Sequence, residues 1–249
     1  MLRRLLRNVG QGAPAGPAED NPLLAYARSP RCERVMIKWL HYFDVYHRHL
    51  SRLRGQAITF IEIGVFNGGS LPMWRDYFGP QAHIVGVDIN PGCARYAEPG
   101  IDVVIGDQGD RGFLRELRDR YPGAAALLDD GGHTMQQQIA TFEELYPSLD
   151  PAGVYLCEDL HTSYLAPFGG GYRRPGTFVE MGKSLVDRLN AAHVGDDGAG
   201  PDAFTVSTDS LHFYDSMLVI ERRARAAPEQ VTFGRLADFH GVPPPPPGA

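Results

Sequence analysis

Short apolar runs alternate with stretches of helical periodicity along the middle of the chain. Runs of five or six residues, rich in Val, Ile and Leu, predict strands at 58–63, 83–88, 102–107, 124–129 and 154–158. Apolar spacing near 3.6 residues predicts helices at 70–77, 113–121, 136–149 and 178–190. Continuously apolar strands that alternate with helices indicate a parallel sheet covered on both faces.

The pattern changes towards both ends of the chain. Apolar residues between 30 and 54, among them Val35, Ile37 and Leu40, recur near helical spacing and predict one or two helices ahead of the sheet. The runs 204–214 and 217–222 meet at a tight turn, which predicts an antiparallel final strand. We expect the Gly-, Ala- and Pro-rich segment 1–22 and the Pro-rich segment 242–249 to be flexible tails around one domain at 23–241.

The composition of the chain restricts the classes of function that the protein can have. Of the 249 residues 43% are hydrophobic, enough for the core of one α/β domain, and the net charge of -6 argues against a nucleic-acid partner. Since no apolar run approaches the length that spans a bilayer or resembles a secretory signal, we expect no membrane partner and a cytoplasmic location. The three cysteines are too few and too dispersed for a disulfide framework or a thiolate zinc site.

Glycines follow the first predicted strand. Glu62 and Gly64 end that strand, and Asn67, Gly68 and Ser70 lead into the next helix. Ligands of doubly wound sheets bind at the carboxyl ends of strands, and glycine lets the backbone approach them. The spacing is GxxxGG and not the GxGxxG of dinucleotide sites, so this turn alone is weak evidence for a cofactor.

The next two strand ends add polar groups. Asp88 ends the second strand, where an acid can accept hydrogen bonds from ribose hydroxyls, and Asp107 and Gln108 end the third, where they can meet an adenine edge. The three strand ends together favour an adenosine-containing cofactor. Asp88 alone also suits NAD, and residues 107–110 also suit an ordinary polar turn.

Acids and a histidine gather at the ends of the fourth and fifth strands. Asp129, Asp130 and His133 follow one strand, and Glu158 and Asp159 follow the other. Crowded carboxylates repel one another, and a hard divalent cation relieves that repulsion, with Mg²⁺ favoured and Mn²⁺ possible. Two alternatives stay open: Asp129 or Asp159 as a helix cap, and an iron site of Asp130, His133 and His161 that would indicate an oxygenase.

Aromatic residues flank the predicted site on both sides. Tyr164 and Tyr172 belong to a glycine-rich stretch that we predict to be a flap over the acceptor. Tyr42, Tyr46 and His49 precede the sheet, and the sequence leaves open whether they cover the cofactor or pack in the core.

The motifs Asp130-Gly131-Gly132-His133, Glu158-Asp159 and 160–164 resemble those of metal-dependent sugar O-methyltransferases. These enzymes, including rhamnosyl-type members, act in macrolide and enediyne antibiotic pathways and are related to cephalosporin-hydroxylase-like proteins. The resemblance covers about residues 41–222. It implies an α/β fold of the class I S-adenosylmethionine (SAM) methyltransferase type: a Rossmann-like, mostly parallel seven-stranded sheet with one antiparallel strand.

The resemblance also implies an activity, which is Mg²⁺-dependent methyl transfer from SAM to a sugar hydroxyl of a small-molecule glycoside. It assigns the metal to Asp130, Glu158 and Asp159 and the general base to His133, and we expect Asp129 to adjoin the cofactor. It implies a homo-oligomer, although we expect this chain to lack the long N-terminal domain that some members use for assembly. An iron-dependent oxygenase, a catechol-type O-methyltransferase and a non-catalytic adenosyl-binding subunit remain alternatives.

Overall fold

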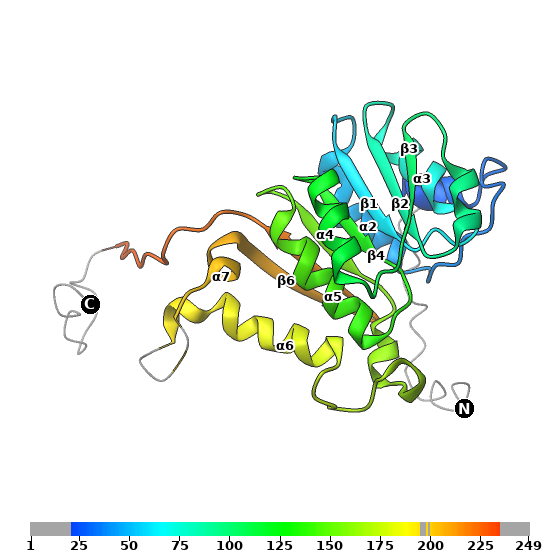
Figure 1. Cartoon of the computed structure of the whole chain (residues 1–249). Helices are drawn as coiled ribbons and strands as arrows, with labels where there is room; N and C mark the ends of the chain where they lie inside the picture. The colour runs from blue at the N-terminus through cyan, green and yellow to red at the C-terminus, as the bar shows by residue number, and fades with distance from the viewer. Residues whose placement is uncertain (1–20, 195–197, 199, 235–249) are drawn as a thin grey trace, which may run out of the picture.

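A seven-stranded sheet forms the middle layer of the protein (Figure 1). The computed structural model describes residues 21–194, 198 and 200–234, and its strand order is β3-β2-β1-β4-β5-β7-β6. The strands are β1 (Thr59–Ile63), β2 (His83–Asp88), β3 (Ile101–Ile105), β4 (Ala126–Asp129), β5 (Val154–Cys157), β6 (Thr208–Tyr214) and β7 (Met217–Arg222). Strands β1 to β5 pair in parallel, and β7 runs antiparallel to both β5 and β6. The predicted mostly parallel sheet with one antiparallel strand is confirmed.

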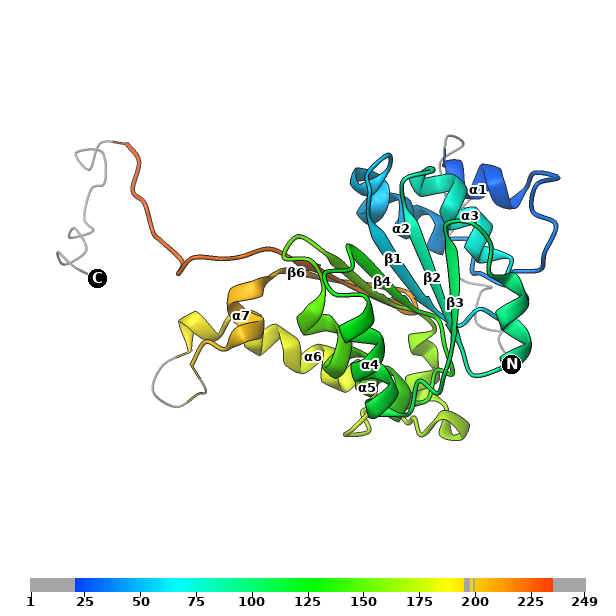
Figure 2. The same cartoon turned by 45° about the horizontal axis from the view of Figure 1, so that its top comes forward.

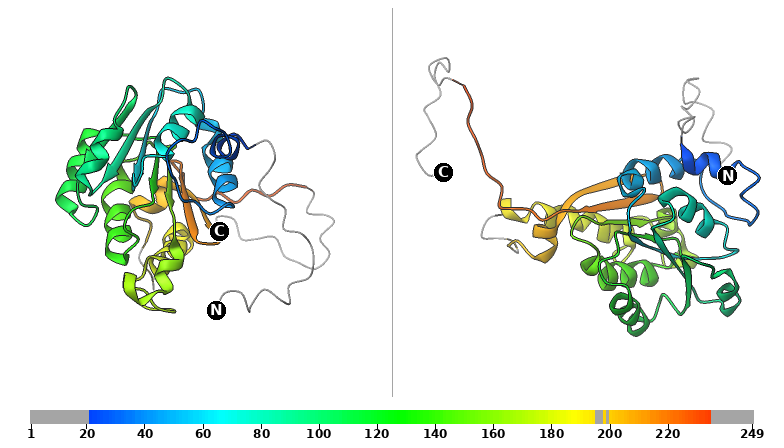
Figure 3. Two further views of the ribbon diagram at one scale, coloured as in Figure 1. Left: turned by 90° about the vertical axis from the view of Figure 1, so that its right-hand side faces the viewer. Right: turned by 90° about the horizontal axis from the view of Figure 1, so that it is seen from above.

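Helices cover both faces of the sheet (Figures 2 and 3). One face packs against α1 (Pro22–Ala27), α2 (Tyr42–Leu50) and α3 (Ser70–Phe78). The other packs against α4 (Arg111–Arg120), α5 (Met135–Leu145) and α6 (Phe178–Leu189), and α7 (Ala203–Ser207) precedes β6. Short 3-10 helices are η3 (Ser51–Leu53), η4 (Pro91–Tyr96), η5 (Tyr146–Ser148), η6 (Leu160–Tyr164), η7 (Ala166–Phe168) and η8 (Ala191–His193).

Side-chain caps start two of the helices that follow strand ends. Asp110 accepts hydrogen bonds from the first amides of α4, and Thr134 forms a capping box with Gln137 at the start of α5. These caps satisfy amides that have no partner inside the helix. Only short loops therefore separate β3 from α4 and β4 from α5, and those loops carry the predicted site.

The segment between α1 and α2 contradicts part of the prediction of one or two helices within residues 30–54. Residues 32–41 form neither helix nor strand, and a single α-helix follows at Tyr42–Leu50. The segment is extended, with alternate residues facing outwards, and it exposes Val35, Ile37 and Leu40 by 55%, 76% and 51%. Apolar spacing was misleading here because these side chains do not join the core. The inward-facing positions include Lys38, whose partners are described below.

A smaller correction concerns the last part of the sheet. Phe204, predicted as the beginning of a strand, lies in α7, where Asp202 and Thr205 form a capping box, and β6 begins at Thr208. The predicted tails at 1–22 and 242–249 lie outside the described residues, apart from Asn21 and Pro22. In the described ranges, no helix has the length and apolarity needed to cross a membrane.

Candidate functional site

A cavity of about 500 Å³ opens at the carboxyl ends of the parallel strands. This volume is typical of small-molecule sites. The predicted residues that line the cavity come from five strand ends and are Gly64, Ser70, Asp88, Asp107, Gln108, Asp130, His133 and Asp159. Some of the predicted cofactor residues therefore share one cavity with His133 and with two of the predicted metal ligands, Asp130 and Asp159.

Asp88 shapes the turn that follows β1. Its Oδ2 accepts hydrogen bonds from the backbone amides of Val65 at 3.0 Å and Phe66 at 2.9 Å, and its Oδ1 accepts one from Asn90 at 2.8 Å. The carboxylate thus fixes the loop that forms one wall of the cavity. A carboxylate oxygen can accept more than one hydrogen bond, so Asp88 retains acceptor capacity towards a ligand.

Position 64 requires a glycine because another part of the backbone lies very close to it. Its φ is +100°, and a Cβ added there would lie 1.9 Å from the carbonyl oxygen of Asp130. Hydrogen bonds from Gly64 N to Val87 O and from Asp130 N to Ile63 O hold the turn in this place. The close approach therefore joins the turn after β1 to the loop that carries Asp130, whereas the sequence had suggested approach to a ligand.

Several predicted cofactor residues bind other parts of the protein and do not line the cavity. Glu62, which is fully buried, accepts hydrogen bonds from Ser70 Oγ at 2.5 Å and Trp74 Nε1 at 3.1 Å. Asn67 accepts one from the Tyr96 hydroxyl at 2.8 Å. The Tyr96 ring also lies against Gly68, where a Cβ would be 2.6 Å from it. These residues support the turn after β1 from behind.

Gln108 and Asp129 form a second supporting group. Gln108 Nε2 donates to Asp129 Oδ1 at 2.6 Å and to Thr141 Oγ1 at 2.9 Å, while Gln108 Oε1 accepts from Gly132 N at 2.9 Å. The Gln108 amide is thus engaged within the protein, although the residue lines the cavity. Burial raises the pKa of Asp129 to about 7, and its Oδ2 has no hydrogen-bond partner within the part of the chain that the structure describes. Asp129 therefore holds the loop before His133 from beneath the cavity.

Asp130, His133 and Asp159 face one another across the cavity. Their potential ligand atoms lie within 4.8 Å of one another, with His133 Nε2 at 3.5 Å from Asp159 Oδ2 and 3.9 Å from Asp130 Oδ1. His133 and Asp159 both have positive φ, at 57° and 54°, which is uncommon for non-glycine residues and typical of functional sites. The buried Nδ1 of His133 has no partner among the described residues.

Glu158, the third predicted metal ligand, turns towards a lysine that the sequence analysis missed. Lys38 Nζ lies 2.5 Å from Asp130 Oδ2, 3.2 Å from Glu158 Oε2 and 3.6 Å from Glu62 Oε1. The Lys38 side chain is only 3% exposed, and the Tyr46 hydroxyl donates to Glu158 from the other side. The sequence does distinguish this residue, because Lys38 is the one charged residue in the apolar run 35–40.

The charges in this cluster do not balance. Burial alone would lower the pKa of Lys38, but Asp130, Glu158 and Glu62 outweigh it and hold the pKa well above its ordinary value. Burial, with the adjacent Asp130, raises the pKa of Glu158 well above its ordinary value even though Lys38 and Tyr46 oppose the shift. Lys38 alone therefore does not remove the cost of ionising Glu158 beside Asp130. A hard divalent cation would remove that cost, and carboxylate oxygens are the ligands that such a cation prefers.

The turn between β6 and β7 holds Asp159 in place. Tyr42 donates to Asp159 Oδ1 at 2.9 Å and to the carbonyl of Ser216 at 3.0 Å, and that carbonyl also accepts from Leu160 N at 3.0 Å. His161 Nδ1 contacts Ser216 Oγ at 2.7 Å. His161 is thus engaged with the turn and is absent from the group formed by Asp130, His133 and Asp159, which counts against the two-histidine iron site.

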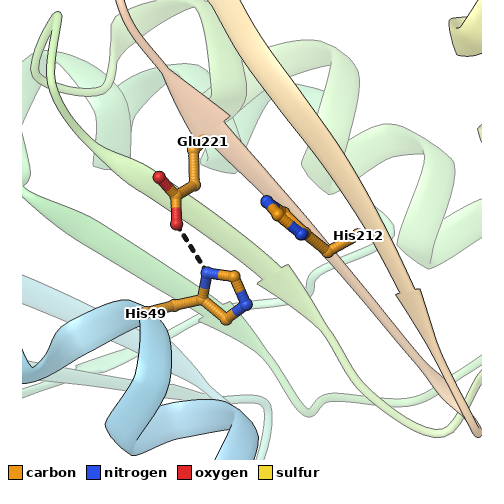
Figure 4. A group of neighbouring side chains, drawn as sticks. All are labelled: His49, His212 and Glu221. Carbon is orange, nitrogen blue, oxygen red and sulfur yellow. Dashed lines mark hydrogen bonds and ion pairs between the residues drawn. The ribbon is translucent and has the colours of Figure 1, made fainter.

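Tyr46 and His49 are not among the residues that line the cavity. Figure 4 shows His49 with a second group of potential ligands, His212 and Glu221. His49 Nδ1 lies 2.5 Å from Glu221 Oε1, and His49 Nε2 lies 2.8 Å from the Tyr214 hydroxyl. Burial lowers the pKa of His49. A neutral imidazole with both nitrogens engaged is a satisfied hydrogen-bonding group. This group therefore attaches α2 to the β6–β7 hairpin.

Comparisons with known proteins show what this chain is similar to, although no protein-family model matches it. The 8-demethyl-8-alpha-L-rhamnosyl tetracenomycin-C 2'-O-methyltransferase of Streptomyces olivaceus is 37% identical over 200 residues, which cover 76% of this chain and 52% of that protein. Demethylmacrocin O-methyltransferase of Streptomyces fradiae is 36% identical over 200 residues, covering 74% and 50% respectively. This chain is a relative of the sugar O-methyltransferases. It spans about half the length of these curated relatives.

A solved relative has the same fold. The MycE methyltransferase from the mycinamycin biosynthetic pathway, in complex with Mg and SAH (S-adenosylhomocysteine), matches with a TM-score of 0.71 and 30% identity. The match covers 84% of this chain and 55% of the MycE chain. A further MycE structure also contains mycinamycin VI, with a TM-score of 0.70. The fold of this chain is the class I SAM methyltransferase fold, as predicted.

Proposed function

We propose that this protein transfers a methyl group from SAM to a sugar hydroxyl of a natural-product glycoside, with Mg²⁺ or Mn²⁺ as the metal. The observation that carries the proposal is the single cavity that Gly64 and Asp88 share with Asp130, His133 and Asp159. A methyl donor in the first part of this cavity would lie beside an acceptor in the second. The relatives support the proposal, because a MycE structure contains Mg, SAH and mycinamycin VI together.

In this proposal the turn after β1 and the ends of β2 and β3 bind the cofactor. Asp88 accepts the ribose hydroxyls while its bonds to Val65 and Phe66 keep the loop in shape. Asp107 lines the cavity near the adenine position. Glu62 and Asp129 position these groups through internal hydrogen bonds and do not contact the cofactor.

Asp130, Glu158 and Asp159 would hold the metal. Bound there, a divalent cation would orient two acceptor oxygens and make a hydroxyl more acidic. Tyr42 keeps Asp159 in position through its hydroxyl, and Tyr46 does the same for Glu158. Lys38 also contacts two of these acids, and the consequence is developed below.

His133 would act as the general base. A sugar hydroxyl is far too weakly acidic to ionise near neutral pH, so its proton must pass to a positioned acceptor during the reaction. His133 Nε2 faces the cavity beside Asp130 and Asp159, and their carboxylates would stabilise the imidazolium that forms. As the proton moves to His133, the oxygen bonds to the methyl carbon and the bond from that carbon to sulfur breaks, which releases S-adenosylhomocysteine.

Labelled SAM and a panel of rhamnosylated natural products test the proposal. We expect label transfer to a glycoside, its loss in EDTA with metal-stripped protein, and its recovery with Mg²⁺ or Mn²⁺. The variant His133→Ala should lower kcat by about 10²–10⁴-fold without changing SAH affinity. The acidic limb of the pH profile of kcat should disappear in the same variant.

Different failures of this experiment have different meanings. Full transfer in EDTA would exclude the metal, and a near-normal kcat in His133→Ala would exclude the base. Loss of Mn²⁺ binding in His133→Ala would make the histidine a ligand. We also propose, from the same resemblance, that residues 23–241 act as one catalytic domain within a homo-oligomer.

A further inference from the structure

Lys38 occupies an unusual position for a lysine. It lies in the extended segment 32–41, in which Ile37 and Trp39 on either side are 76% and 50% exposed. The Lys38 side chain points the opposite way, is 3% exposed, and ends among carboxylates from β1, the loop after β4 and the end of β5. A buried ammonium is costly unless it is paired, so the acids determine where this segment lies.

The oxygens that hold Lys38 are those that the proposed metal needs. Lys38 Nζ is 2.5 Å from Asp130 Oδ2 and within 3.3 Å of both oxygens of Glu158. Mg²⁺ binds oxygen at about 2.0–2.1 Å in a near-octahedral shell, which brings its ligands close together. Two cations that share Asp130 and Glu158 would repel each other strongly at such short distances. The metal carries twice the charge of the ammonium and makes the shorter contacts. We therefore expect the oxygens of Asp130 and Glu158 to bind the metal in preference to Lys38.

We propose that Lys38 is a built-in counter-cation that the divalent metal displaces from Asp130 and Glu158, and that its release moves one wall of the cofactor cavity. This inference rests on the metal site of the proposed function. In the metal-free protein, Lys38 keeps the acids together and compensates part of their charge. In the metal-bound protein, the lysine and its segment take a second position.

The segment links the two halves of the cavity. Val35, Met36, Ile37 and Lys38 line it. The carbonyl oxygens of Arg34 and Val35 lie so close to the start of α3 that a Cβ on Gly69 would be within 2.6 Å of either. Movement of Lys38 is thus transmitted to the turn that contacts the cofactor. By linkage, metal and cofactor must then affect each other's affinity equally.

Binding of Mn²⁺ to the full chain, measured without SAM from the electron paramagnetic resonance of the free ion, tests the competition. Lys38→Met keeps most of the side-chain volume and removes the charge, so we expect at least tenfold tighter Mn²⁺ binding. The matched control is Lys183→Met, which removes the other lysine of the sequence, half-exposed and paired with Glu180 on α6. Its Mn²⁺ affinity should equal that of the wild type.

Two measurements on the wild-type protein do not depend on the folding of Lys38→Met. With ¹⁵N-labelled lysine, Lys38 and Lys183 give two ammonium resonances, which Lys183→Arg assigns, and Mg²⁺ should shift only that of Lys38. Mg²⁺ should also change the fluorescence of Trp39, whose ring centroid lies 6.0 Å from that of His161. The change should be absent in Trp39→Phe.

The outcomes separate this inference from the metal site on which it rests. If the wild type binds Mn²⁺ but Lys38→Met binds it no more tightly, the metal site stands and the displacement is wrong. An unmoved Lys38 resonance at saturating Mg²⁺ also overturns the displacement, and unchanged Trp39 emission overturns the coupling to the cavity wall. If neither wild type nor Lys38→Met binds Mn²⁺, both the metal site and the role of Lys38 are wrong.

Discussion

Replacement of Gly64 by alanine measures how closely the turn after β1 must approach the loop that carries Asp130. At φ +100° an alanine is strained by about 1–2 kcal/mol. Its Cβ would also lie 1.9 Å from the Asp130 carbonyl oxygen and 2.7 Å from the carbonyl carbon. Backbone atoms cannot rotate away, so the two loops must separate, which costs a further 1–3 kcal/mol, roughly the cost of overpacking. The expected loss in the free energy of unfolding is about 2–5 kcal/mol.

Gly123→Ala is the matched control. Gly123 also has a positive φ, of +67°, but a Cβ there would meet no atom within 4 Å, so only the strain of about 1–2 kcal/mol applies. Equilibrium unfolding in urea gives both free energies, and the two variants should differ by about 1–3 kcal/mol. Calorimetry should show weaker SAH and Mn²⁺ binding in Gly64→Ala alone. Equal stability losses in the two variants would refute the close approach.

Two further predictions concern carboxylates on either side of the cavity. The variant Asp88→Ala leaves the amides of Val65 and Phe66 without their acceptor. The affinity for SAH, measured by calorimetry, should therefore fall about tenfold to a hundredfold. An unchanged affinity would remove Asp88 from the cofactor site. Burial raises the pKa of Asp129 to about 7, so between pH 4 and 7 the folded state keeps a proton that the unfolded chain releases. The stability of the metal-free protein should therefore fall across that range by about 4 kcal/mol, at 1.36 kcal/mol per pKa unit. In the variant Asp129→Asn, the free energy of unfolding measured in urea should lack this decrease with pH. An unchanged pH dependence of that free energy would contradict the raised pKa of Asp129.

The sheet could be predicted from the sequence because its signals are local. Runs such as 83–88 are apolar on both faces and end at polar residues, so each strand and its carboxyl end could be identified separately. The segment 32–41 was mispredicted because its position depends on distant acids that attract Lys38. Apolar spacing carries no information about such a contact.

The candidate site was predictable to the level of strand ends. Asp130, His133 and Asp159 converge because neighbouring parallel strands end at one edge, which the sequence indicates. The direction of each side chain at that edge was not predictable. Glu62 lies among the same strand ends, yet its carboxylate is fully buried and binds Ser70 and Trp74. Whether a strand-end acid faces the cavity or the core depends on partners from other elements.

The turn at Ser216 has a consequence for how the protein is made. Ribosomes synthesise chains from the N-terminus, so β1 to β5 and the cavity between them emerge before β6 and β7. Until β7 pairs with β5, the edge of β5 is open to other chains, and Tyr42 and Leu160 lack the Ser216 carbonyl that fixes the loop of Asp159. A chain terminated before residue 216 would thus contain the strands of the proposed cofactor site without the Ser216 carbonyl that helps to fix Asp159. The β6–β7 hairpin must therefore be synthesised before the loop of Asp159 is fixed beside the rest of the cavity.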